Sequence, residues 1–246
     1  MKCDFSQIEL RIAAKVTGDA RMLAAYQRGE DLHTLTAARF LGVEPAAVTK
    51  EARQMAKPVN FGAIYGLGPR SLRLKARADY GRDMTEAEAR GFLDAFFAQF
   101  PAVRAWHDRL KRGAAAEVRT LGGRRIAVAP DQFYGAKANY VVQGTGGDGL
   151  KRAREQLPRN RPRVRVQGTG GDGLKRALVL LWERRAECPR AEVVLAVHDE
   201  VVLEVPEAEG EGAKGWLARC MVDGMAPLLD PVPVEVEVTA GRTWAG

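Results

Sequence analysis

Two apolar runs joined by three polar residues, VVLAVHDEVVLEV (193–205), place the strongest constraint on the fold of this chain. Each run is rich in β-branched residues and long enough for a buried strand. The residues between them, His198, Asp199 and Glu200, predict a tight turn, so the segment is expected to form a β-hairpin. Because flanking strands hold such a turn rigidly, the carboxylates at its tip are candidates for binding a ligand.

The length and composition exclude several classes of protein. A chain of 246 residues, 46% of them hydrophobic, can bury a large core as one domain or as two lobes. No stretch reaches the roughly 18–20 apolar residues of a membrane span, and no signal-peptide pattern follows Met1. Three scattered cysteines fit a reducing compartment and offer no paired-cysteine zinc site. A cytoplasmic protein that does not contact membranes is therefore expected.

Helices are expected to crowd the middle of the chain, and strands its C-terminal half. The helical patterns cover 8–18, 20–29, 32–42, 48–66, 85–100, 101–116, 136–142, 178–185 and 207–226, and further strand patterns cover a hairpin at 117–130 and a run at 232–238. Asp19 and Asp31 are expected to cap helices, and Pro58 is expected to kink its helix or mark a boundary. This order predicts an α+β lobe with a helical insertion.

One segment, QGTGGDGLKRA, occurs twice without change, at 143–153 and 167–177. An identical pair of this length indicates a local duplication in which one copy fills a structural position. The Arg- and Pro-rich stretch 151–166 is interpreted as a looped or disordered insertion, and it accounts for +6 of the net charge of +7. The overall charge therefore says little about nucleic-acid binding.

The N-terminal segment DFSQIELR (4–11) places a second carboxylate, Asp4, just before a helix. If Asp4 lies opposite the Asp199 turn, the two carboxylates form an oxygen-rich site for divalent metals, as two-metal phosphoryl transfer requires. The alternative is that Asp4 is an ordinary helix cap.

The segment ARQMAKPVNFGAIYG (52–66) carries two cations and then two aromatic residues at intervals of four, namely Arg53, Lys57, Phe61 and Tyr65. At this spacing the side chains follow one helix face. Cations followed by aromatic rings suit a triphosphate with a base stacked beyond it. The alternative is an amphipathic helix whose cations extend to solvent.

Taken in order, these segments resemble the motifs of the DNA polymerase I family, family A. DFSQIELR is similar to its motif A, RQMAKPVNFGAIYG to its motif B, NYVVQGTGGDGLK to the segment between B and C, and VHDEVV to its motif C. The resemblance implies an α+β right-hand polymerase palm, an antiparallel sheet with packed helices, and a helical fingers insertion. Residues 1–32 and 129–246 would form the palm, and 33–128 the fingers.

The resemblance also implies roles for individual residues. Asp4, Asp199 and the backbone carbonyl of Phe5 would bind two Mg²⁺ ions, with Mn²⁺ as a substitute, and Lys57 would donate a proton to pyrophosphate. Gln7, Glu9, His33, Arg53, Lys57, Phe61 and Tyr65 would contact the incoming dNTP. Within this set, Glu9 would crowd the ribose 2′ position and Phe61 would stack on the base and sugar.

Primer–template DNA is the second implied partner. Asn139, Gln143 or Gln167, His198, Arg124 and Arg125 would contact it, and Glu200 would support the metal site. Of the two glutamines, Gln167 is favoured because a helix follows the second copy. The alternative is that the first copy docks and the basic stretch loops out before the helix. A solvated turn is the alternative for the two arginines.

The chain departs from the family pattern at its start, since only three residues precede Asp4. The family's thumb and first palm strands would then be missing, which indicates a truncated fragment. Beside template-directed DNA synthesis, the alternatives are a catalytically incompetent fragment that binds nucleic acid and one half of a split polymerase that needs a separate chain. A metal-dependent nuclease is disfavoured because it leaves Arg53, Lys57, Phe61 and Tyr65 without a role.

Overall fold

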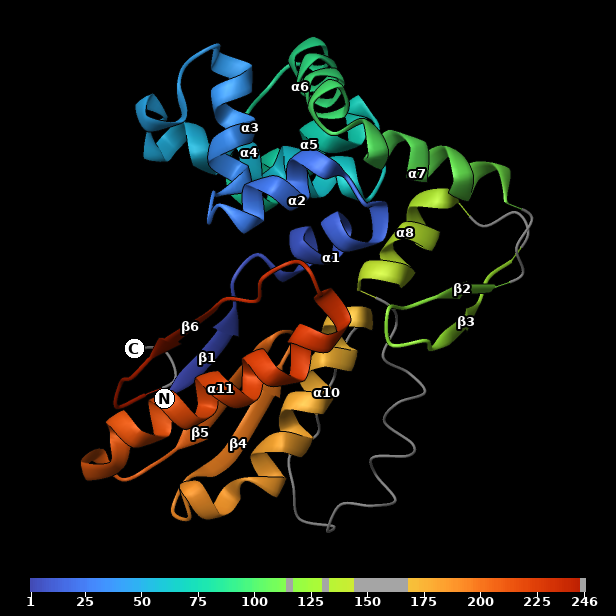
Figure 1. Ribbon diagram of the computed structural model, residues 1–246. Helices are drawn as coiled ribbons and strands as arrows, with labels where there is room; N and C mark the ends of the chain where they lie inside the picture. The colour runs from blue at the N-terminus through green and yellow to red at the C-terminus, as the bar shows by residue number, and fades with distance from the viewer. Residues whose placement is uncertain (114–116, 130–132, 144–167, 244–246) are drawn as a thin grey trace. The chain divides into compact units, whose positions relative to one another are not determined.

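A four-stranded antiparallel sheet in the order β4-β5-β1-β6 is the central feature of the computed structural model (Figure 1). The strands are β1 (Lys2–Phe5), β4 (Glu192–Val197), β5 (Glu200–Glu204) and β6 (Val236–Thr239). The predicted hairpin at 193–205 is confirmed as β4 and β5. The three central residues of β5, 201–203, are buried, whereas β4 is an edge strand whose residues alternate between exposed and half-buried over most of its length.

The structure describes residues 1–113, 117–129, 133–143 and 168–243. The chain divides into two units. Unit 1 comprises Met1–Ile12, Arg119–Ile126 and Tyr140–Gly246, and unit 2 comprises Ala13–Val118 and Ala127–Asn139. The insertion predicted at 151–166 lies outside the described residues.

In unit 1, two long helices pack side by side, α10 (Gly168–Glu183) and α11 (Gly210–Leu229), and α11 contacts β1 and β6 (Figure 1). Small residues let their backbones approach closely. A Cβ atom added to Gly224 would lie 2.4 Å from the backbone nitrogen of Ala177, and one added to Gly173 would overlap the side chain of Met225. The glycine at position 173 of the repeated segment is therefore explained by helix packing.

Strand β1 alternates in burial as its sequence requires. Cys3 and Phe5 are buried, whereas Asp4 points to the opposite face of the sheet. Backbone hydrogen bonds between Met1 and Leu203 extend the pairing of β1 with β5. The position of the predicted catalytic carboxylate is thus set by strand periodicity.

Unit 2 is mainly helical. Its helices include α2 (Ala20–Gln27), α3 (Leu32–Leu41), α4 (Lys50–Ile64), α5 (Pro69–Tyr80), α6 (Glu86–Gln99) and α7 (Pro101–Arg112), while α1 (Ile8–Thr17) and α8 (Tyr134–Val142) each contribute residues to both units. A short hairpin, β2 (Glu117–Arg119) and β3 (Arg125–Ala127), turns at Gly122-Gly123 as predicted.

The helix starts follow from local side-chain chemistry. Asp19 and Asp31 cap α2 and α3 as predicted, and Thr85 forms a reciprocal capping box with Glu88 at the start of α6. Pro58 lies inside α4, which continues without a boundary from Lys50 to Ile64. The α+β class with an antiparallel sheet is confirmed. No helix among the described residues is long and apolar enough to cross a membrane.

Candidate functional site

The carboxylates of Asp4 and Asp199 lie together in unit 1, within hydrogen-bond contact of each other. Asp199 stands in the two-residue turn between β4 and β5, where Val197 pairs with Glu200. Asp4 stands in β1, directly opposite Glu200 of β5 and Glu237 of β6. Directly paired residues share a face of the sheet, so three acidic side chains form a row beside Asp199.

Burial, together with neighbouring like charges, raises the pKa of both aspartates. Burial, and then the negative charge of Asp4, raise the pKa of Asp199 to about 7, and Glu9 adds to the shift. Burial and the charge of Glu200 raise the pKa of Asp4, while its hydrogen bond with Asp199 opposes the change. Lys2 lies beside this row, with its Nζ 3.8 Å from Glu200 Oε2. When ionised, Asp4 and Asp199 concentrate negative charge at this point, and a bound cation would neutralise it.

The backbone beside both aspartates is strained. His198, just before Asp199, has φ 56°, and Gln7, three residues after Asp4, has φ 52°. They are the non-glycine residues with positive φ in the described part of the chain. A two-residue hairpin turn that follows the twist of its strands needs a positive φ at its first position, and histidine tolerates this better than most residues. The residue that follows this turn position, Asp199, contacts Asp4 of β1.

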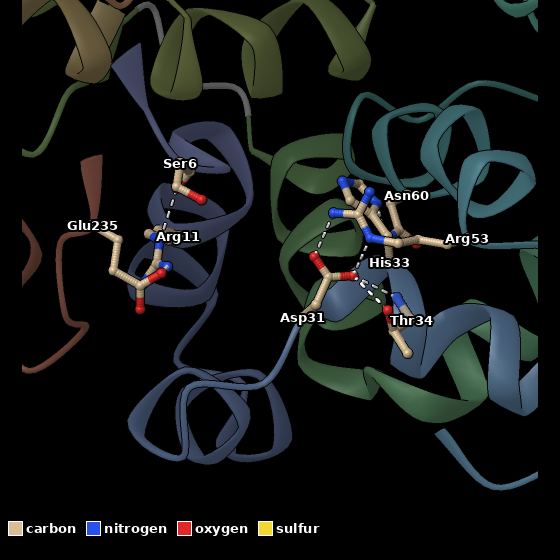
Figure 2. A network of polar contacts seen from close by, with 8 residues as sticks. All are labelled: Ser6, Arg11, Asp31, His33, Thr34, Arg53, Asn60 and Glu235. Atoms are coloured by element: carbon tan, nitrogen blue, oxygen red, sulfur yellow. Dashed lines mark hydrogen bonds and ion pairs between the residues drawn. The ribbon is translucent and has the colours of Figure 1, made fainter. Parts of the chain in front are cut away.

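A buried arginine that the sequence analysis did not single out anchors the helix after Asp4 (Figure 2). Arg11 is 2% exposed, donates from Nε to the carbonyl of Ser6 at 2.9 Å and pairs with Glu235 Oε2 at 2.7 Å. It also donates to the carbonyl of Pro233 at 2.6 Å. These contacts hold the turn at Ser6 against the segment that enters β6.

Two more of the predicted residues meet in unit 1. The Gln143 amide donates a hydrogen bond to Oε1 of Glu9. Gln167, the favoured alternative, lies outside the described residues. The structure therefore brings Asp4, Asp199, Glu9 and Gln143 into one cluster, with Glu200 beside Asp4.

The arginines at the β2–β3 turn differ in their surroundings. Arg124 Nε lies 3.3 Å from Asp172 Oδ1, and the Thr120 hydroxyl donates to Asp172 Oδ2 at 2.6 Å. Arg125 is exposed on β3. Asp172, from the second copy of the repeat, had no role in the sequence analysis. In the sequence, Asp172 is marked only by its position five residues after Gln167, and an acid at such a spacing is too common to predict an ion pair.

In unit 2, Arg53 is held by a bidentate ion pair (Figure 2). Its Nε donates to Asp31 Oδ1 at 3.0 Å and its Nη2 to Oδ2 at 2.7 Å. Asp31 also accepts from the backbone and hydroxyl of Thr34 at the start of α3. These hydrogen bonds lower the pKa of Asp31 to about 2 although its burial acts in the opposite direction. One carboxylate therefore caps α3 and orients the guanidinium on α4.

His33 lies next to this pair. It is buried, its Nδ1 lies 2.9 Å from Asn60 Nδ2, and its ring centroid lies 5.8 Å from that of Phe61. Burial lowers the pKa of His33 to about 4, and the charges of Arg53 and Lys57 act in the same direction. The imidazole is therefore neutral at physiological pH.

The face of α4 carries the predicted pattern. Arg53, Lys57 and Phe61 are half-buried at intervals of four, and Tyr65 follows at the helix end. That end is fixed by two carbonyl contacts: the His107 ring lies 2.9 Å from the oxygen of Ile64, and the Tyr134 hydroxyl donates to Gly66 at 3.1 Å. Asn139 also belongs to unit 2.

The oxygen-only donor set of Asp4, Asp199 and the Phe5 carbonyl fits a hard cation such as Mg²⁺. This fit is supported by the contact between the carboxylates of Asp4 and Asp199, which repel each other when both are ionised. Within the described residues, no three His, Cys, Asp or Glu side chains converge as a metal-binding group. The remaining ligands of an octahedral ion would therefore be water or oxygen atoms of a ligand.

Comparison with known proteins extends over the whole chain. The model of the family described as DNA polymerase family A matches residues 1–246. This chain belongs to DNA polymerase family A. It is 37% identical over 247 residues to DNA polymerase I of Aquifex aeolicus, and 39% identical over 257 residues to the thermostable DNA polymerase I of Thermus filiformis.

A solved structure has the same fold. The POL domain of Pol1 from M. smegmatis, in complex with DNA primer-template and dNTP, matches with a TM-score of 0.75 and 27% identity over 99% of this chain. The chain spans 38% of the Aquifex aeolicus protein, 26% of the Thermus filiformis protein and 39% of that structure's chain. Family membership does not assign a role to any single residue, so the predicted roles remain predictions.

Proposed function

We propose that this family A chain carries out template-directed DNA synthesis, transferring nucleotides from dNTPs to a primer 3′-hydroxyl. The observation that carries the proposal is the contact between Asp4 and Asp199 in unit 1, in a row of acidic side chains that a divalent cation would neutralise. The complex of the M. smegmatis POL domain with primer-template and dNTP supports the choice of substrates. Residues 1–32 and 129–246 would act as palm and 33–128 as fingers.

Asp4, Asp199 and the Phe5 carbonyl would hold Mg²⁺, with Glu200 supporting Asp4 from the neighbouring strand. When bound, the metal would activate the 3′-hydroxyl and neutralise the triphosphate. Both aspartates have to be ionised to bind it, and cation binding would itself favour the ionised form. Arg11 contributes by holding the turn between Asp4 and α1 in place.

The side chains on α4 would bind the dNTP. Arg53, oriented by Asp31, and Lys57 would contact the phosphates, and Phe61 would stack on the base and sugar. Neutral His33 can donate a hydrogen bond without adding charge. Lys57 would donate a proton to the leaving pyrophosphate.

Primer extension by the purified full chain, with Mg²⁺ and dNTPs, tests this proposal. Asp199→Asn keeps the shape of the side chain and should lower the extension rate by about a thousandfold or more, because metal-held charge is worth several kcal/mol in the transition state. Glu192→Gln is a matched control, since it removes a carboxylate from the other end of the same hairpin, where Glu192 pairs with Glu204.

No extension by the unaltered chain, together with primer–template binding that Asp199→Asn leaves unchanged, would contradict the proposal. That result would favour a nucleic-acid-binding fragment or a chain that needs a separate partner to supply a thumb and further palm strands.

A further inference from the structure

The two copies of QGTGGDGLKRA are used differently in unit 1. From the first copy, Gln143 follows directly after α8. From the second copy, the residues from Gly168 onward form the start of α10. Within the described part of the chain, which leaves out 144–167, the motif is represented by Gln143 from the first copy and by the residues from Gly168 onward from the second.

The contact made by the first copy is with a carboxylate in the candidate site. The Gln143 amide donates to Glu9 Oε1, and Glu9 lies within electrostatic reach of Asp199. A hydrogen bond from an amide to a carboxylate is charge-assisted and restricts the rotamer of the acid. Gln143 therefore holds the Glu9 carboxylate in one position on α1.

The contacts made by the second copy are structural. Asp172 accepts a hydrogen bond from Thr120 and pairs with Arg124. Leu174 and Ala177 are fully buried, and the close approach of α10 to α11 depends on Ala177 facing a glycine. These residues attach the β2–β3 turn and α11 to α10.

We propose that the two copies divide the work of one motif: the first supplies Gln143 as a positioning residue for Glu9, and the second supplies the helix. This inference rests on the proposed function where it concerns substrate choice. Glu9, held by Gln143, would exclude the 2′-hydroxyl of a ribonucleotide. Gln167 was the glutamine favoured for contact with the primer–template, whereas the contact with Glu9 is made by Gln143.

Removing one copy together with the residues between the copies leaves one intact copy of the motif. Deleting 144–167 joins Gln143 to Gly168 and restores a single uninterrupted QGTGGDGLKRA. Deleting 143–166 produces the same polypeptide. The shortened chain keeps every residue whose contacts are described above.

The first experiment replaces two identical residues in identical local sequence. Gln143→Ala and Gln167→Ala are compared in the full chain for incorporation of dNTP against rNTP, beside Glu9→Ala. Gln143→Ala is expected to lower the preference for dNTP by about tenfold, the effect of one hydrogen bond to a charged group. Gln167→Ala is expected to keep the original preference. An equal loss in both variants, or a loss with Gln167→Ala alone, would overturn the inference.

The second experiment does not need catalysis. Gln143→Ala should lower the melting temperature by about 3 °C with Glu9 present and by less than about 1 °C in a Glu9→Ala background. The chain without 144–167 should melt within about 2 °C of the original. Loss of the coupling, or failure of the shortened chain to fold, would overturn the inference. If the unaltered chain extends no primer, the proposed function fails and these melting measurements still decide the inference.

Discussion

The charged side chains of unit 1 and unit 2 are arranged on opposite principles. In unit 1, Asp4 and Asp199 touch and face further acids, so burial and repulsion raise the pKa of Asp199 to about 7. In unit 2, Asp31 is paired with Arg53 and hydrogen-bonded to Thr34, which lowers its pKa to about 2. The first arrangement places like charges together, whereas the second pairs opposite charges within the protein.

The carboxylates of Asp4 and Asp199 would need a bound cation to balance their charge. The Asp31–Arg53 pair already contains both charges, and Asp31 fixes the orientation of the guanidinium. Two carboxylates in contact beside a strained hairpin turn are costly to ionise together, and a bound cation would offset that cost. A bidentate ion pair on a helix cap costs little and presents Arg53 in a fixed orientation. This contrast is the basis for the roles proposed above, metal binding for the carboxylates of unit 1 and phosphate binding for Arg53 of unit 2.

The largest expected difference between the two units lies in how their titratable groups make the free energy of unfolding depend on pH. His33 has a folded pKa of about 4, below its unfolded value, so the unfolded chain binds more protons between about pH 6.5 and 4. Stability should therefore fall as the pH is lowered through this window, by up to about 3 kcal/mol from His33. The raised pKa values of Asp4 and Asp199 act with the opposite sign.

Urea denaturation of the full chain and of His33→Asn at several pH values measures the contribution of His33. The difference between the two should grow from pH 4 to pH 6.5 and stay constant above it. His107, which burial also gives a lowered pKa, remains in both proteins and cancels in the difference. A difference that does not change with pH would show that His33 is not buried as a neutral ring.

The next effect separates the two functions of Asp31. Asp31→Ala removes the α3 cap and the partner of Arg53, and should lower the free energy of unfolding by about 2 kcal/mol. Asp31→Asn keeps a capping oxygen and should cost about half as much. Both are measured by urea denaturation at neutral pH. Equal losses would show that the cap contributes nothing beyond the ion pair.

The smallest effect is stabilisation by Mg²⁺, which should depend on unit 1 alone. At a concentration tenfold above its dissociation constant, a bound ion adds about 1.4 kcal/mol to stability. The melting temperature of the full chain should rise with Mg²⁺, and removal by a chelator should reverse the rise. Asp199→Asn should abolish the response and Asp31→Asn should retain it. A response that Asp199→Asn leaves intact would place the cation elsewhere.

Local features of both regions could be predicted from the sequence. The two apolar runs predicted the β4–β5 hairpin, and the predicted caps at Asp19 and Asp31 were confirmed. These features depend on residues within a few positions of each other, where side-chain chemistry and chain geometry act directly.

Features that depend on pairing across the chain could not be predicted. Glu237 faces Asp4 only because β6 pairs with β1, and strand order is not encoded in any one strand. Asp31 was recognised as a cap, but its ion pair with Arg53, 22 residues away, depends on how α3 and α4 pack. The helix-packing role of Gly173 likewise required the position of Met225 in α11.

The measurement that tests the central claim most directly is single-nucleotide incorporation by Asp199→Asn and Arg53→Ala, with kcat and the KM for dNTP determined separately. Asp199→Asn should lower kcat by about a thousandfold with little change in KM, because the metal acts on the transition state. Arg53→Ala should mainly raise the KM, by about tenfold, because one phosphate contact is lost. An Asp199→Asn variant that keeps its kcat, or an Arg53→Ala variant that changes kcat alone, would contradict the division of tasks between the two units.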